Sequence, residues 1–89
     1  MLKIQRSANG RVLFTLSGRI EGEDVKELRQ LLALETEGQQ LALDLRDVTI
    51  VNDLAVKFLA GSEADNIKLE NCPPYIREWI DRVKVRTKL

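Results

Sequence analysis

The segment Leu41–Val56 constrains the fold more than any other part of this chain. It reads LALDLRDVTIVNDLAV: an apolar run typical of a buried strand, a polar interruption, a second apolar step, and then two residues favoured at helix starts, Asn52 and Asp53. A strand that passes directly into a helix brings unpaired backbone N–H groups and the positive end of the helix dipole to the surface. Such a point suits an anion or a phosphorylated side chain. The acidic Asp53 already lies there, which makes this segment the best functional clue in the sequence.

The residues before this segment predict a hairpin and a helix. Apolar residues alternate over residues 2–7 and 11–17, and the turn pair Asn9-Gly10 stands between the two runs. Apolar residues at helical spacing follow over residues 25–35. Glu23 and Asp24 occupy the expected first turn, where the helix dipole favours acids, and Gly38 is the expected stop.

The residues after it predict a second helix, a strand and a third helix. The second helix begins at Asn52 or Asp53, and a short edge strand covers residues 67–69. Pro73 and Pro74 mark the start of the last helix, because proline is tolerated in a first turn. Tyr75 and Trp79 are interpreted as core anchors of this helix, and residues 83–89 as a frayed tail.

The resulting order is β-β-α-β-α-β-α. It predicts an α/β fold with a mixed, mostly parallel four-stranded sheet and helices packed against it, because strand-helix-strand units form right-handed parallel crossovers. With 89 residues, we expect a single domain over residues 1–89.

Composition argues against several functional classes. Histidine is absent and Cys72 is the only cysteine, so Ser–His and Cys–His nucleophile pairs and imidazole metal ligands are missing, and we expect no enzyme, cofactor or metal site. The 14 basic and 14 acidic residues give a net charge of zero, which disfavours nucleic-acid binding. No apolar run approaches the ~20 residues of a membrane span, and charges interrupt the N-terminus, so we expect a cytoplasmic protein without membrane insertion.

The chain resembles a STAS domain, the fold of bacterial anti-sigma factor antagonists. The resemblance covers roughly residues 2–82, and three segments in matching order carry it: LSGRI at 16–20, LALDLRDVTIVNDLAV, and IKLENCPPYIREWI at 67–80. It implies a non-catalytic module of signal transduction and transcription regulation that binds a partner protein. In the family the partner is typically an ATP-binding anti-sigma kinase, and a serine or threonine at the start of the second helix is the phosphorylated switch.

This sequence departs from the family at the switch. The alignment places Asn52 at the usual aspartate and Asp53 at the usual phosphoacceptor, and Asp53 has no hydroxyl to phosphorylate. Asp53 is interpreted either as a helix cap or dipole partner, or as a fixed negative charge at a docking surface. Thr49 is an alternative acceptor, and its alternative interpretation is a residue that simply suits a strand end.

The resemblance also implies where a partner docks. The predicted partner-binding residues lie in the 17–22 loop, at the strand end and at the start of the second helix: Ser17, Gly18, Arg19, Glu21, Gly22, Thr49, Asn52, Asp53, Leu54, Val56 and Lys57. Turn geometry alone would equally explain the glycines. Two alternatives stay open, a small STAS subunit that supports an ABC-transporter ATPase, and a structural domain that forms a homodimer.

Overall fold

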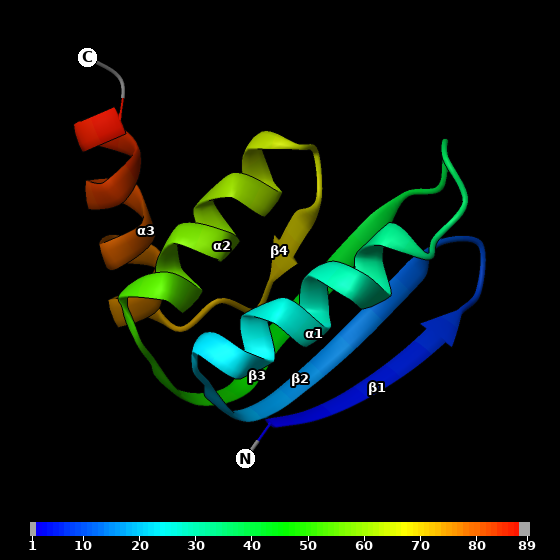
Figure 1. Ribbon diagram of the computed structural model, residues 1–89, viewed down its shortest axis with the longest axis horizontal. Coiled ribbons are helices and arrows are strands. Elements are labelled where there is room, and N and C mark those ends of the chain that lie inside the picture. The colour runs from blue at the N-terminus through cyan, green and yellow to red at the C-terminus, as the bar shows by residue number, and fades with distance from the viewer. Residues whose placement is uncertain (1, 88–89) are drawn as a thin grey trace.

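The computed structural model describes residues 2–87, with side chains over residues 2–84 (Figure 1). Its elements follow the predicted order β-β-α-β-α-β-α. Their bounds are β1 (Leu2–Ala8), β2 (Val12–Ile20), α1 (Gly22–Ala33), β3 (Leu41–Val51), α2 (Asp53–Ala64), β4 (Lys68–Glu70) and α3 (Pro74–Thr87).

The strands form one sheet in the order β1-β2-β3-β4, which confirms the predicted mixed sheet. β1 pairs antiparallel with β2, whereas β2, β3 and β4 are parallel. The hairpin loop differs in detail from a two-residue turn, because Ala8 pairs with Val12 and three residues lie between them. Of these, Gly10 alone has a positive φ, at 82°. One positive-φ position instead of two is why the loop is longer than a type I′ turn.

β3 is one continuous strand, although the sequence predicted a polar break after Leu45. Its pairing with β2 shifts twice: Thr15 pairs with Asp44 but Ser17 with Asp47, and Gly18 pairs with Val48 but Arg19 with Ile50. Each shift inserts one extra residue in β3, which defines a β-bulge. The polar residues of this segment therefore lie within a bulged strand.

The core lies between one face of the sheet and the helices. Alternate residues of β2, namely Val12, Phe14 and Leu16, are buried on this face together with Leu43 and Leu45 of β3. α1 contributes Val25 and Leu28, α2 contributes Ala55, Val56, Phe58 and Leu59, and α3 contributes Ile76 and Ile80. α1 ends at Ala33, earlier than the predicted stop, and Gly38 lies in the following loop with φ of 90°.

The opposite face of the sheet carries polar side chains. Lys3, Gln5, Thr15, Ser17 and Asp47 line a shallow hollow of about 260 Å³ there. The buried Ala42 of β3 lies between β2 and β4, and an ion pair between Arg11 and Glu70 joins the ends of those two flanking strands.

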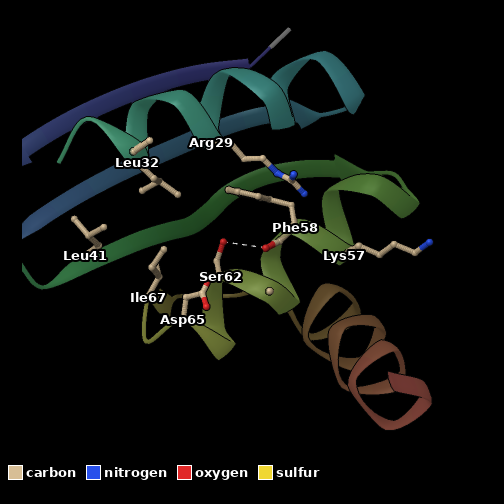
Figure 2. A pocket seen from close by; sticks show the side chains of 10 residues that line it. Arg29, Leu32, Leu41, Lys57, Phe58, Ser62, Asp65 and Ile67 are labelled. Atoms are coloured by element: carbon tan, nitrogen blue, oxygen red, sulfur yellow. Dashed lines mark hydrogen bonds between the residues drawn. The ribbon is translucent and has the colours of Figure 1, made fainter. Parts of the chain in front are cut away.

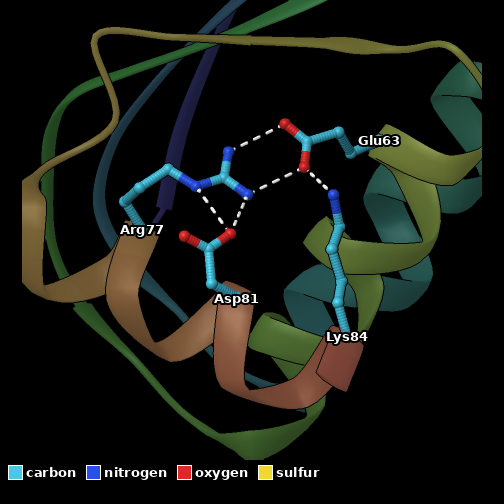
Figure 3. A network of polar contacts seen from close by, with 4 residues as sticks. All are labelled: Glu63, Arg77, Asp81 and Lys84. Atoms are coloured by element: carbon cyan, nitrogen blue, oxygen red, sulfur yellow. Dashed lines mark hydrogen bonds and ion pairs between the residues drawn. The ribbon is translucent and has the colours of Figure 1, made fainter. Parts of the chain in front are cut away.

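A network of ion pairs and hydrogen bonds connects α3 to α2 (Figure 3). Arg77 donates two hydrogen bonds of 2.8 Å to the carboxylate of Glu63 and one of 2.8 Å to Asp81. Lys84 forms an ion pair with the same Glu63 carboxylate. Hydrogen bonds from Arg77 and then Lys84 lower the pKa of Glu63 to about 2, although burial opposes them. α3 extends to Thr87, past the predicted fraying point at residue 83, and residues 88–89 of the predicted tail lie outside the described residues.

Glu63→Gln is expected to lower the free energy of unfolding and to make that free energy depend less on pH in the acid range. The folded-state pKa of Glu63 lies below the ordinary 4.5, so its contribution is present above about pH 4.5 and is lost as the pH falls toward 2. Because the pairs are partly solvated, we expect a loss of about 1–2 kcal/mol at pH 7. Urea unfolding followed by circular dichroism at pH 7 and pH 3 measures both effects.

The matched control is Glu78→Gln, which removes the exposed pair with Arg82 on the same helix. It should change the unfolding free energy by less than about 0.5 kcal/mol. Equal losses in the two variants would show that the Glu63 network has no special role.

Candidate protein-interaction surface

Three helices begin along one edge of the sheet. β2, β3 and β4 are parallel and each is followed by a helix, so the first turns of α1, α2 and α3 lie at the carboxyl ends of these strands (Figure 1). Parallel sheets place their binding residues at this edge in many α/β proteins. The junction of β3 and α2 lies between the other two.

Asn52 forms the cap of α2. Its backbone is extended (φ −108°, ψ −178°), and its Oδ1 accepts a hydrogen bond of 2.9 Å from the backbone N–H of Ala55. The Asn52 carbonyl accepts the N–H of Val56 at 3.0 Å, the first hydrogen bond of the helix. The capping function at this junction therefore belongs to Asn52 and not to Asp53.

Asp53 is the first residue of α2 and is exposed. Within residues 2–87, its carboxylate takes part in no hydrogen bond or ion pair that the structure assigns. Its charge still interacts favourably with the helix dipole. The interpretation of Asp53 as a helix cap is therefore wrong. Two interpretations are left: an interaction with the helix dipole, and a negative charge at a docking surface.

Large apolar side chains are exposed around this junction. Ile50, Leu54 and Tyr75 are 48%, 56% and 49% exposed. The Tyr75 hydroxyl donates a hydrogen bond to the carbonyl of Thr49, which holds the start of α3 against the end of β3. Leu54 lies against the start of α1, because a Cβ added to Gly22 would be 3.2 Å from Cδ1 of Leu54. We call Ile50, Asp53, Leu54 and Tyr75 the junction surface.

Acidic residues extend the junction surface toward α1. A depression of about 700 Å³ is lined by Leu2, Glu21, Gly22, Glu23, Asp24, Glu27 and Asn52. Glu21 and Asp24 form a capping box at the start of α1, with the Asp24 carboxylate accepting the N–H of Glu21 at 2.9 Å. Two of these acids thus stabilise the helix, and together the group gives this edge a negative character.

The structure distributes the predicted partner-binding residues over several surfaces. Glu21, Gly22, Asn52, Asp53 and Leu54 meet at the junction, and Arg19 and Thr49 are exposed beside it. Ser17 instead lies on the polar face of the sheet, and Lys57 lines a groove between α1 and α2.

Neither Val56 nor Gly18 offers an exposed side chain to a partner. The prediction for Val56 is wrong, because its side chain is fully buried in the core. Gly18 has a φ of 99°, next to the second bulge, which accounts for glycine at this position on backbone grounds.

Sequence reasoning missed Ile50 and assigned Tyr75 to the core. Trp79 does pack against the core, but Tyr75 does not. A signal for Tyr75 was present, since the buried stripe of α3 starts at Ile76 and continues at Ile80, and Tyr75 is off that stripe. The exposure of Ile50 depends on the bulge before it, which no local pattern reveals.

The described residues offer little for cofactor chemistry. No group of three or more carboxylate or thiol side chains in residues 2–87 is arranged to hold a metal ion. Burial raises the pKa of the half-buried Cys72 thiol, so it is not activated as a nucleophile. None of the helices described is long and apolar enough to cross a membrane.

Asn52→Ala should cost about 1 kcal/mol of unfolding free energy, because it leaves the N–H of Ala55 without its cap. Asp53→Asn should cost less than about 0.5 kcal/mol, since only a dipole interaction of an exposed charge is lost. Urea denaturation of the two variants beside the wild type measures the difference. The assignment of the cap fails if Asp53→Asn proves the more damaging change.

Comparison with solved structures identifies the fold. A protein of the DUF3478 family from Shewanella loihica PV-4, described as having a SpoIIAA-like fold, matches with a TM-score of 0.54 and 16% identity over 97% of this chain and 79% of its own. The structure of Mglu matches with a TM-score of 0.57 and 24% identity over 81% of this chain. This match covers only 19% of the Mglu chain. Neither a protein-family model nor a curated protein matches the sequence. The chain therefore has a SpoIIAA-like, STAS-like fold.

Proposed function

We propose that this chain is a non-catalytic module that binds a partner protein through the junction surface. The observation that carries the proposal is the exposure of Ile50, Leu54 and Tyr75, together with the acidic Asp53, at the junction of β3 and α2 and the start of α3. Large apolar side chains that stay exposed together mark interaction sites in monomeric proteins. The STAS-like fold supports the proposal, because in STAS domains the start of the second helix is the regulated docking site.

The acidic residues of the surface support a partner with complementary charge. Glu21, Glu23, Asp24 and Glu27 border the junction and Asp53 lies within it. A partner that fits this surface has a small apolar patch with basic residues at its rim, since complementary charges set specificity and association rate. The partner class that we propose is an ATP-binding regulator such as an anti-sigma kinase in a cytoplasmic partner-switching circuit.

Asp53 keeps a negative charge at the start of α2 that phosphorylation of a hydroxyl cannot switch. We call this the fixed state. A phosphorylated serine carries about −1.5 to −2 charges, whereas a carboxylate carries one. The negative charge at the start of α2 is thus permanent and smaller than that of a phosphate. Binding would then be set by the amount of partner and by competition, and not by phosphorylation of residue 53.

Leu54→Lys should abolish capture of the partner, or weaken its binding by at least about tenfold, because it puts a charge in the apolar centre of the surface. The matched control is Leu34→Lys, at a leucine that is 81% exposed beyond the other end of α1. Capture from the source cytosol followed by calorimetry with the recovered protein tests this. Equal affinities of the two variants would contradict the junction surface, and recovery of a transporter ATPase would identify the alternative partner class.

A phosphorylation experiment tests the fixed state. Incubation with ATP and a partner kinase of the Ser/Thr type should leave residue 53 unmodified, since Asp53 offers no hydroxyl. Mass spectrometry of the wild type and of Thr49→Ala locates any phosphate. Phosphate on the exposed Thr49 that the variant lacks would show that the switch has moved by four residues, and the fixed state would be wrong.

A further inference from the structure

A groove of about 540 Å³ runs between α1 and α2 (Figure 2). Five apolar side chains line it: Leu32 and Ala33 of α1, Phe58 of α2, Leu41 at the start of β3, and Ile67 just before β4. Phe58 is buried, Ala33 is exposed, and the other three are half-buried. The size falls within the range of ~300–1,000 Å³ that is usual for small-molecule sites.

Gly61 keeps the groove open. It lies inside α2, although glycine is the poorest helix former after proline. A Cβ added at this position would meet no atom within 4 Å, so no packing contact requires glycine here. The missing side chain leaves one wall of the groove uncovered.

One positively charged group, the Arg29 guanidinium, lies over the groove. Figure 2 shows it beside Phe58, with Leu41 and Ile67 toward the other end, while the ammonium group of Lys57 points away from these side chains. In the part of the chain that the structure describes, no assigned ion pair or hydrogen bond engages either cation. Asp65 lies eight residues beyond Lys57, about 12 Å along the helix axis at 1.5 Å per residue.

Neutral polar groups contribute little to the groove. The Ser62 hydroxyl is the natural candidate, but it donates to the carbonyl of Phe58 at 2.9 Å within its own helix. The lining therefore combines an apolar floor with charged ends. A sugar or another neutral polar ligand would find few directional partners there.

We propose that this groove binds a small amphipathic monocarboxylate reversibly. The Arg29 guanidinium holds the carboxylate, and the hydrocarbon chain lies on Leu32, Leu41, Phe58 and Ile67. Asp65 disfavours a second anionic group at the far end, which selects against dicarboxylates. The proposal is independent of partner binding, because it rests on the middle and end of α2 and not on the junction surface.

Decanoate below its micelle concentration is the probe, with decanol as its neutral counterpart. Amide NMR titration of the full chain should show saturable shifts at Leu32, Leu41, Gly61 and Ile67, and decanol should bind more weakly. The variant Arg29→Gln should weaken decanoate binding by about tenfold or more and leave decanol binding unchanged. The matched control is Lys26→Gln, an exposed lysine of α1 that does not line the groove, and it should bind as the wild type does.

Two substitutions at Gly61 test the cavity itself. Gly61→Ala should keep the affinity for decanoate, because its methyl group fits in open space. Gly61→Leu should lose binding by filling the groove, while circular dichroism shows an unchanged helix content. Retained binding in a folded Gly61→Leu variant would overturn the proposal.

Other outcomes would also overturn it. Decanol and decanoate binding with equal affinity would indicate apolar adsorption only. Shifts at the groove residues that depend on protein concentration without any ligand would assign the groove to a second copy of the chain. Binding to anionic phospholipid vesicles without saturable decanoate binding would assign it to a membrane surface.

Discussion

Burial of a single face of the sheet is the constraint on which the rest of this fold depends. β3 has eleven residues, and it must supply apolar side chains to the buried face along that whole length. Strict alternation after Leu45 would point Asp47 and Thr49 into the core, where polar groups without partners cost several kcal/mol. Two bulges prevent this, and the residues that face the core are Val48 and Val51 instead. The apolar spacing of the segment is three and not two for this reason.

The candidate site follows from the same adjustment. The second bulge leaves Thr49 and Ile50 on the outside of the sheet and brings Val51 back to the core directly before Asn52. Asn52 then caps α2, so Asp53 begins the helix with its carboxylate in solvent. The packing of the core and the composition of the junction surface are two results of one local irregularity.

The sequence predicted the order of the elements well, because hairpin, cap and proline signals are local. It also identified Asn52 as a capping residue. It failed where an element's environment depends on distant contacts. Val56 was assigned to the partner-binding surface by the family resemblance, whereas α2 packs against α1, β4 and α3 and buries this side chain. The bulges of β3 depend on its register with β2, which the alternation of one strand does not contain.

α3 differs from the other helices in the elements that it contacts. It packs chiefly on α2, and its outer contacts are the charges around Glu63 and the hydrogen bond from Tyr75 to Thr49. The ion pairs around Glu63 weaken in salt and in acid, unlike the apolar contacts of α1 with the core. The only tryptophan of the chain, Trp79, lies on α3 and is half-buried against the core. Its fluorescence is therefore a built-in reporter of the docking of α3, and it would register local opening at this end of the molecule before the sheet unfolds.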